Sequence, residues 1–220
     1  MIRFYAHRSK NNHNFKDNSK EAILNVLNKE YISGIEIDIR LTKDKKVIVY
    51  HDPVIVIKNK IKIINETNLI DLIKVNIYTL SEILNSIKTD KTIILEIKYE
   101  NKLNKKDADY FIKEIKKYNY LNLYVCSFNT KLMKYIKKNY NGKCGIIIGS
   151  VINKCKCFNF LDFNLIKYGL FRKIPKKETF IWTINDVNKL KRLTKNNKKI
   201  LNIITDKAYL LNTSDILQSH

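Results

Sequence analysis

The sequence predicts an α/β protein whose fold is a closed (β/α)8 barrel of the TIM type, with a hairpin and a short insertion after the second strand. Three observations lead to this fold class. Eight short apolar segments that suit buried strands recur along the chain, and stretches with helical spacing of apolar residues separate most of them. The 220 residues are enough for one such barrel. Polar residues follow several of the strands directly, where parallel barrels gather their reactive groups.

The first elements alternate as this fold requires. Residues 2–6 form a short apolar strand. Residues 17–19 offer a helix N-cap, and residues 21–30 carry apolar side chains at helical spacing. Residues 34–40 form the second strand, one face of which consists of isoleucine alone. A continuously apolar face is typical of a parallel strand that helices cover.

A hairpin and an insertion are predicted next. Residues 43–46 form a tight turn, and residues 47–50 form a strand that returns along the second strand. If this hairpin is symmetric about the centre of its turn, His51 lies opposite Asp38. The Asn- and Lys-rich segment 53–76 is irregular and too long for an ordinary connection, so we expect a lid or small insertion beside the site.

The remaining chain repeats the alternation of strands and helices. Helices are expected to open at residues 80–84 and to cover residues 105–118, 132–140 and a segment after Asp186 that ends at about residue 195. Segment 158–166 is ambiguous but has room for one strand. The eight barrel strands are therefore expected near residues 2, 34, 92, 123, 144, 162, 179 and 202.

Composition predicts a single cytoplasmic domain over residues 1–220. No repeat or low-complexity linker divides the chain, and no run of 18 apolar residues predicts a membrane span. The N-terminus lacks the apolar core of a secretory signal and already has the pattern of a strand. The four cysteines, Cys126, Cys144, Cys155 and Cys157, show no disulfide framework, so we expect reduced thiols.

The net charge of +21 raises the question of a nucleic-acid partner. Only five of the 42 basic residues are arginine, although arginine is the usual reader of bases and clamp of phosphates. The lysines are also spread over the whole chain. We therefore expect no dedicated nucleic-acid partner, and a positive field that attracts anionic small-molecule substrates.

A candidate metal site comes from the second strand and the strand near residue 92. Glu36 and Asp38 point to the same face of their strand, and Glu96 and Lys98 share a face of theirs. Buried carboxylates are costly unless a positive group lies between them. Oxygen ligands are those that Mg²⁺ or Ca²⁺ prefers, so the pattern indicates a divalent metal, although exposed strand polarity is the alternative.

Two histidines and two aromatic residues complete the candidate site. His7 ends the first strand, and His51 follows the hairpin strand. A single histidine of this kind is more often a structural, hydrogen-bonded residue, but the two together beside an arginine and an aspartate favour a functional role. Trp182 and Phe128 also end strands, where they wall a substrate pocket or, alternatively, pack in the core.

Several segments together resemble the glycerophosphodiester phosphodiesterase family, and the likeness covers nearly the whole chain. His7-Arg8 resembles the start of the family's His-Arg-Gly, and Glu36-Ile37-Asp38 resembles its Glu-Leu-Asp. The other segments that match in order and spacing are Leu41-Thr42-Lys43-Asp44, His51-Asp52, Tyr78-Thr79-Leu80-Ser81-Glu82-Ile83-Leu84, Leu95-Glu96-Ile97-Lys98, Ser127-Phe128, Trp182-Thr183-Ile184-Asn185 and Ile204-Thr205-Asp206.

The resemblance implies a function and a set of roles. It implies metal-dependent hydrolysis of glycerophosphodiesters to sn-glycerol 3-phosphate and an alcohol, with water or a substrate hydroxyl as the nucleophile. The implied metal ligands are Glu36, Asp38 and Glu96; the implied acid/base pair is His7 and His51; the implied phosphate-binding residues are Arg8 and Lys98. Charge agrees, because a divalent metal and two fixed cations balance three carboxylates and one phosphodiester.

The sequence also departs from the family pattern. Ser9 stands where the family has glycine, and Lys16-Asp17-Asn18-Ser19 replaces its Pro-Glu-Asn-Thr. The usual Arg-Thr pair after His51 is missing.

Two alternative functions remain. One is an enzyme like a lysophospholipase D that acts on lipid phosphodiesters with peripheral membrane contact. The other is a barrel that binds phosphodiesters without turnover. Isoleucines of the 53–76 segment supply the apolar track that the first alternative needs.

Overall fold

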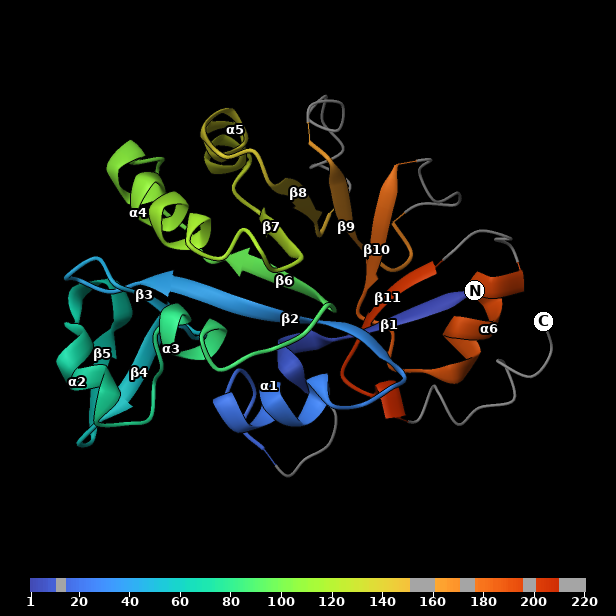
Figure 1. The fold of residues 1–220 in the computed structure, drawn as a ribbon, viewed down its shortest axis with the longest axis horizontal. Coiled ribbons are helices and arrows are strands. Elements are labelled where there is room, and N and C mark those ends of the chain that lie inside the picture. Colours follow the sequence, from blue (N-terminus) through green and yellow to red (C-terminus); the bar gives the residue numbers. More distant parts are fainter. Residues whose placement is uncertain (11–14, 151–160, 171–176, 196–200, 210–220) are drawn as a thin grey trace.

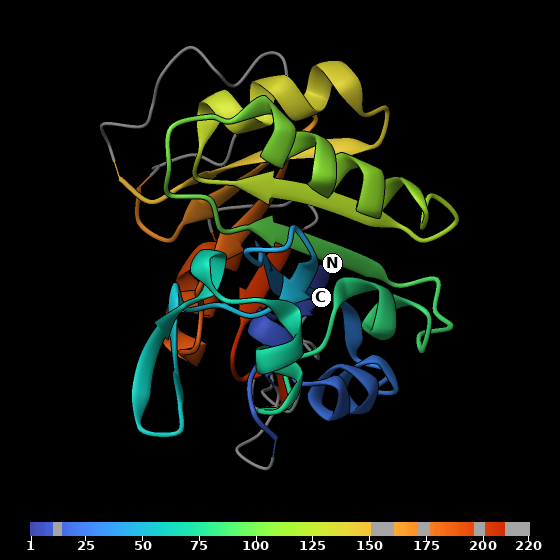
Figure 2. The same ribbon diagram turned by 90° about the vertical axis from the view of Figure 1, so that its left-hand side faces the viewer.

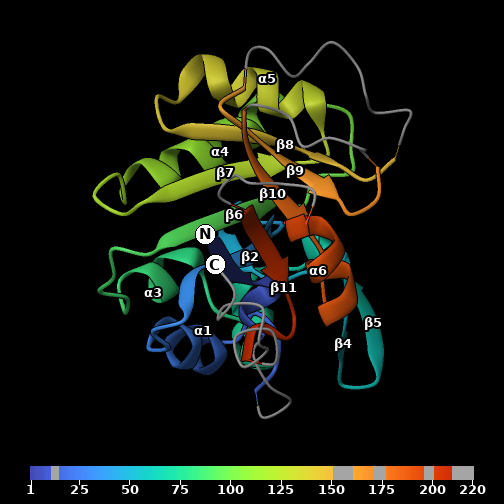
Figure 3. The ribbon, with the colours of Figure 1, turned by 90° about the vertical axis from the view of Figure 1, so that its right-hand side faces the viewer.

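The structure is a computed structural model that describes residues 1–10, 15–150, 161–170, 177–195 and 201–209. Within these residues, parallel strands close into a barrel, and helices pack on its outside (Figure 1). Figure 2 and Figure 3 show the same fold from the left-hand and right-hand sides of Figure 1. None of the helices in this part of the chain combines the length and apolar character that crossing a membrane requires.

Eight strands form the barrel, as predicted from the sequence. Their order is β1-β2-β6-β7-β8-β9-β10-β11, every neighbouring pair is parallel, and β1 closes the ring by pairing with both β2 and β11. Their bounds are Ile2–Ala6 (β1), Ile32–Leu41 (β2), Thr92–Ile97 (β6), Leu123–Ser127 (β7), Lys143–Ile148 (β8), Phe163–Lys167 (β9), Glu178–Trp182 (β10) and Leu201–Thr205 (β11). The eight predicted strand positions are thus confirmed, including the ambiguous sixth.

Helices follow most of the strands within the described residues. They are Lys20–Leu27 (α1), Leu80–Leu84 (α3), Lys105–Lys116 (α4), Thr130–Asn139 (α5) and Val187–Lys195 (α6), each close to its predicted position. Ser19 is the N-cap of α1, because its side chain accepts a hydrogen bond from the Ala22 backbone N–H. Two of the four cysteines, Cys126 and Cys144, are buried free thiols. The other two, Cys155 and Cys157, lie outside the described residues.

The barrel interior is filled by side chains at the end where the strands begin. Tyr5, Tyr124, Phe163 and Phe180 pack against one another there, with ring centroids 4.9–5.7 Å apart. Gly145 makes room for these rings, since a Cβ at that position would lie 2.4 Å from the Phe163 ring. The larger apolar core lies between the strands and the helices. Because one end of the interior is packed with aromatic rings, a site can open only at the opposite end, where the strands finish.

The hairpin after β2 has a different register from the one predicted. In β3 (Val47–Val49), Val49 pairs with Ile39, so Tyr50 and not His51 lies opposite Asp38. The Tyr50 backbone N–H donates to the Asp38 carbonyl oxygen at 2.9 Å. The reason is the turn: Lys45 has φ of 59°, so a three-residue loop with a left-handed third residue replaces the symmetric turn.

The 53–76 segment is regular, which corrects the prediction of an irregular excursion. It contains a second hairpin of β4 (Val54–Ile57) and β5 (Lys60–Ile63), a short 3-10 helix η2 (Ile64–Glu66) and the helix α2 (Leu69–Ile73). This insertion has a small apolar core of its own, formed by Ile48, Ile55, Ile64, Leu72 and Ile77. Ile48 belongs to β3, so the insertion packs on the barrel through the first hairpin. In β5, isoleucine alternates with lysine, and such alternation predicts a strand. The polar composition of the whole segment obscured this pattern.

Candidate active site

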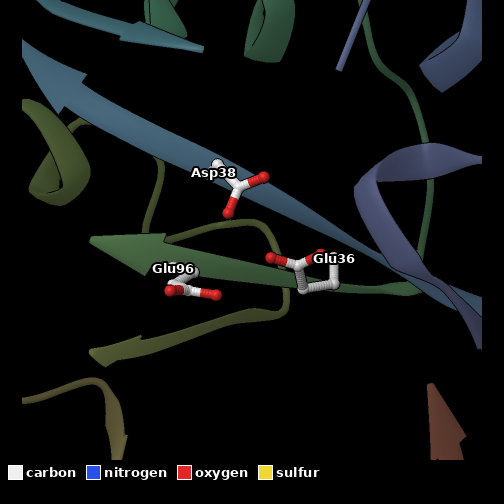
Figure 4. Close-up of side chains that lie close together, drawn as sticks. All are labelled: Glu36, Asp38 and Glu96. Carbon is white, nitrogen blue, oxygen red and sulfur yellow. The ribbon is translucent and has the colours of Figure 1, made fainter. Parts of the chain in front are cut away.

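Three carboxylates from two adjacent strands meet inside the barrel near the ends of those strands (Figure 4). Glu36 and Asp38 come from β2, Glu96 comes from β6, and Asp38 is the direct neighbour of Glu96 across the ladder. One oxygen from each residue lies within 4.8 Å of the others, and all three side chains are buried. Period-two alternation puts them on the inner face, because Ile35, Ile37 and Ile39 occupy the outer one.

The carboxylates repel one another in this buried position. Burial, followed by the charge of Asp38, raises the pKa of Glu36 to about 8. Burial and the Asp38 charge also raise the pKa of Glu96. Without further positive charge the cluster therefore retains a proton at neutral pH.

Two basic residues supply part of that charge. Lys98 Nζ lies 2.5 Å from Glu96 Oε1 and 3.1 Å from Asp38 Oδ1. Burial lowers the pKa of Lys98, but the Asp38 and Glu96 charges outweigh burial and raise it overall. Arg8 donates its backbone N–H to Glu36 Oε2 at 2.9 Å, and its Nε lies 3.6 Å from Asp38 Oδ2. Both predicted phosphate-binding residues thus border the carboxylate cluster.

His7 lies directly after β1 and is held by the carboxylate of Asp206, the residue that follows the last strand. Its Nδ1 is 2.8 Å from Asp206 Oδ1, and its Nε2 is 3.9 Å from Glu36 Oε2. Burial lowers the pKa of His7, but the hydrogen bond to Asp206 and the charge of Glu36 raise it more, so the net pKa is raised. The imidazole is therefore oriented with one nitrogen fixed and the other directed toward the carboxylates.

His51 has a different environment. Its Nδ1 is 2.7 Å from Asp52 Oδ1, and its Nε2 is 2.7 Å from Arg8 Nη2. A guanidinium can only donate, so Nε2 accepts and the proton resides on Nδ1, which donates to Asp52. Burial lowers the pKa of His51 and outweighs the opposing effect of Asp52. In this arrangement His51 is therefore neutral.

These groups border one pocket of about 260 Å³. Its lining residues are His7, Arg8, Glu36, His51, Glu96, Lys98, Phe128, Ile147, Leu165, Trp182 and Ile204. The predicted aromatic residues form one wall, because Phe128 and Trp182 meet edge to face at 5.9 Å between ring centroids. The buried Trp182 Nε1 has no acceptor among the described residues. The structure thus brings all nine sequence-predicted site residues together: eight line the pocket, and Asp38 contacts Arg8 and Lys98, which line it.

Two polar residues of the site had no role predicted from the sequence. Asn18 Nδ2 donates to Asp38 Oδ2 at 2.8 Å, and Asn18 Oδ1 accepts from the Asp38 backbone N–H at 3.1 Å. The pattern suggested only an N-cap for this segment. Asp206, which holds His7, follows β11 directly, and that position at a strand end was the available signal. Asp17 instead points to Lys10, with 3.7 Å between the charged atoms.

The backbone after β1 explains one departure from the family pattern. Arg8 and Ser9 have φ of 51° and 55°, a left-handed conformation that glycine adopts most easily. Ser9 occupies it with a buried side chain. The turn directs the Arg8 backbone N–H at Glu36, so a conformation that favours glycine is retained here by serine.

Comparisons with known proteins agree with this geometry. The family model described as "Glycerophosphoryl diester phosphodiesterase family" matches residues 7–151. A glycerophosphodiester phosphodiesterase structure from Thermotoga maritima is 24% identical with a TM-score of 0.77, over 96% of this chain and 97% of that one. An Oleispira antarctica phosphodiesterase in complex with the product sn-glycerol-3-phosphate is 18% identical with a TM-score of 0.80, over 96% and 95%.

A sequence relative covers less of the chain. An uncharacterized protein of Mycoplasma genitalium is 31% identical over 140 residues, which is 53% of this chain and 57% of that protein. The chain thus matches little more than half the length of this curated relative. The solved structures share the barrel fold over almost their whole length.

Proposed function

The chain belongs to the glycerophosphoryl diester phosphodiesterase family, and from this premise we propose that it hydrolyses glycerophosphodiesters to sn-glycerol 3-phosphate and an alcohol in a metal-dependent reaction. The observation that carries the proposal is a cluster of three buried carboxylates, two of which line one pocket together with two histidines. Phosphodiester cleavage needs charge balanced on the non-bridging oxygens, a proton taken from the nucleophile and a proton given to the leaving oxygen. The pocket offers residues for each need.

The carboxylate cluster fits a divalent cation. Glu36 Oε1 is buried without a hydrogen-bond donor among the described residues, and the pKa of Glu36 is raised to about 8. Both facts indicate that Lys98 and Arg8 do not satisfy the cluster by themselves. Glu36, Asp38 and Glu96 would hold Mg²⁺ or Ca²⁺, which both prefer oxygen ligands. Bound there, the cation would supply positive charge for the phosphate oxygens.

The histidines would perform the proton transfers. His51 carries no proton on Nε2, and this favours His51 as the group that takes a proton from the nucleophile. His7, with a raised pKa, would then donate a proton to the leaving oxygen. Asp206 and Asp52 would keep the two rings oriented. Each well-placed acid or base is worth about 10²–10⁴-fold in rate.

The other residues would bind substrate. Arg8 and Lys98 carry charges that attract the phosphate, and they would exchange part of their contact with carboxylates for contact with substrate. Phe128 and Trp182 would wall the pocket, and Trp182 Nε1 would find an acceptor on the substrate. We also infer that residues 1–220 form one domain, because the insertion packs on β3.

The test is release of sn-glycerol 3-phosphate from glycerophosphocholine. We expect turnover with Mg²⁺ or Ca²⁺ and loss of turnover with a chelator. We expect His7→Ala and Glu36→Ala to abolish turnover, whereas the exposed Glu66→Ala should retain it as a matched control. Circular dichroism should show that the variants remain folded. Undiminished turnover by His7→Ala or Glu36→Ala would refute the assignment, and a folded wild type inactive with every divalent metal would favour the non-catalytic barrel.

One observation favours a second substrate class. Several apolar side chains of the insertion are exposed, which suits the lipid phosphodiesters of a lysophospholipase D-like enzyme. Rates on lysophosphatidylcholine and glycerophosphocholine distinguish the two classes, because a lipid-directed enzyme would turn over the lysolipid faster.

A further inference from the structure

The β4–β5 hairpin has an outward face that consists of apolar side chains alone. Val54 pairs with Ile63 and Val56 pairs with Ile61, so these four residues lie on one face of the two-stranded sheet. Their exposed fractions are 42%, 44%, 63% and 74% for Val54, Ile63, Val56 and Ile61. We call these four residues the apolar hairpin face. Such a surface is costly in water and needs a partner.

The opposite face of the hairpin already has its packing partner. Ile55 is buried in the small core of the insertion, and Ile57 packs against that core. The Ile64 backbone N–H donates to the Pro53 carbonyl oxygen at 2.9 Å and closes the base of the hairpin. The hairpin is thus anchored on one face and free on the other. Ile55 and Ile64 therefore do not contribute to the apolar track expected from the sequence.

Exposed apolar side chains are concentrated in this insertion. Of the eleven large apolar side chains that are exposed within the described residues, six lie between residues 54 and 73. Scattered exposed residues need no explanation, but a cluster on one small element does.

The hairpin is also basic. Lys58 lies at the tip of the hairpin, and its side chain is exposed. Lys60 pairs with Ile57 and Lys62 pairs with Ile55, so these two exposed lysines extend from the face opposite the apolar hairpin face. Residues 53–65 contain no acidic residue. A neighbouring groove of about 650 Å³ is lined by Lys43, Lys58, Lys60, Lys62 and Lys74 together with Glu66 and Asp71. Asp71 pairs with Lys74 at 3.0 Å, so the groove keeps a net positive charge.

The hairpin stands beside the candidate site. β4 begins three residues after His51, and Figure 2 shows the hairpin projecting at the end of the barrel where β2 and β6 finish. A surface that contacted the hairpin would therefore lie near the mouth of the pocket.

We propose that the apolar hairpin face and its lysines dock the protein onto an anionic lipid surface. Valine and isoleucine would enter the boundary between headgroups and acyl chains. The lysines at the tip and on the opposite face are exposed, and their long side chains would extend around the edges of the narrow hairpin to reach the lipid phosphates. A second copy of the chain is a poorer occupant, because each hairpin carries three lysines and no acidic residue, so two hairpins repel each other. Docking is independent of the proposed hydrolysis, although it would bring lipid-derived phosphodiesters to the pocket.

The test is cosedimentation of the full chain with vesicles of phosphatidylcholine, with and without phosphatidylglycerol. We expect binding to the anionic vesicles that weakens with salt. The triple variant Lys58→Gln/Lys60→Gln/Lys62→Gln should bind about 100-fold more weakly, at roughly fivefold per lysine. The double variant Val56→Gln/Ile61→Gln should lose about tenfold or more.

Matched controls separate the hairpin from bulk properties of the chain. The triple variant Lys102→Gln/Lys106→Gln/Lys113→Gln changes the net charge equally at exposed positions, and the double variant Tyr110→Gln/Tyr120→Gln removes exposed apolar surface elsewhere. Both should bind vesicles as the wild type does. All variants should keep the wild-type circular dichroism spectrum and turnover of soluble glycerophosphocholine.

Three results would overturn the proposal. The first is that the wild type does not bind anionic vesicles. The second is that the control variants lose as much binding as the hairpin variants. The third is that the wild type binds no vesicles but forms a dimer in solution, and that Val56→Gln/Ile61→Gln dissociates this dimer. Because binding is measured without turnover, an inactive wild type that still binds vesicles would count against the proposed function and not against docking.

Discussion

Glu36→Gln is expected to stabilise the metal-free protein while abolishing its stabilisation by metal. The pKa of Glu36 is raised from 4.5 to about 8, so the folded protein keeps a proton that the unfolded chain releases. The stability of the metal-free protein is therefore fully present below about pH 4.5 and falls as pH rises toward about pH 8. Glutamine has no such proton and retains an oxygen that can accept the Arg8 backbone N–H.

The size of the effect follows from the same pKa. Neutral pH lies about 2.5 pH units above the ordinary value of 4.5, and each pH unit costs about 1.4 kcal/mol, so the cost is on the order of 3 kcal/mol. For a chain of this length that corresponds to a rise in Tm of roughly 6–12 °C. With saturating divalent metal the wild type should have the higher Tm of the two proteins, because metal binding stabilises only a folded state that retains its metal ligands.

The assay is thermal unfolding of the wild type and Glu36→Gln, followed by circular dichroism, between about pH 5 and pH 8 in chelator and in excess Mg²⁺ or Ca²⁺. Glu66→Gln, at an exposed position, is the matched control and should follow the wild type throughout. If Glu36→Gln in chelator were less stable than the wild type at neutral pH, the carboxylate would be charged and well paired by Arg8 and Lys98. The carboxylate cluster would then need no cation.

Three further predictions concern the same cluster. Metal binding at about pH 7 should release close to one proton, because Glu36 must lose its proton before it can bind the cation. Calorimetry of metal binding in buffers of different ionisation enthalpy measures the number of protons released. The same apparent binding enthalpy in every buffer would contradict this prediction. Asp206→Asn should lower the pKa of His7, because the group that accepts the hydrogen bond from His7 Nδ1 loses its negative charge. NMR titration of the histidines measures this pKa. An unchanged pKa of His7 would show that Asp206 does not hold this ring. Asn18→Ala should destabilise the protein by about 1–3 kcal/mol in urea unfolding, because Oδ2 and the backbone N–H of buried Asp38 each lose a hydrogen bond to Asn18. An unchanged midpoint would show that water replaces these two bonds.

The barrel was predictable because its strands are encoded locally. Each is a short segment rich in buried aliphatic or aromatic residues, and parallel strands buried on both faces need such segments. The meeting of Glu36, Asp38 and Glu96 was predictable for a related reason. Strand alternation fixes which face a side chain occupies, and neighbouring parallel strands end together.

Other features depend on backbone geometry that residue types specify weakly. The register of the β2–β3 hairpin depends on the left-handed conformation of Lys45, a residue that rarely signals it. Asn18 also has a positive φ, which turns its side chain from the expected helix cap toward Asp38. Asp206 is paired with His7 across 199 positions of sequence, a contact that exists only once the barrel has closed.

A crystal structure with Mn²⁺ and sn-glycerol 3-phosphate bound is the most direct test of the proposed site. We predict an anomalous manganese peak among the oxygens of Glu36, Asp38 and Glu96, with His7 and His51 within hydrogen-bonding reach of the phosphate. A manganese peak elsewhere in the molecule, or a phosphate that neither imidazole can reach, would contradict the account.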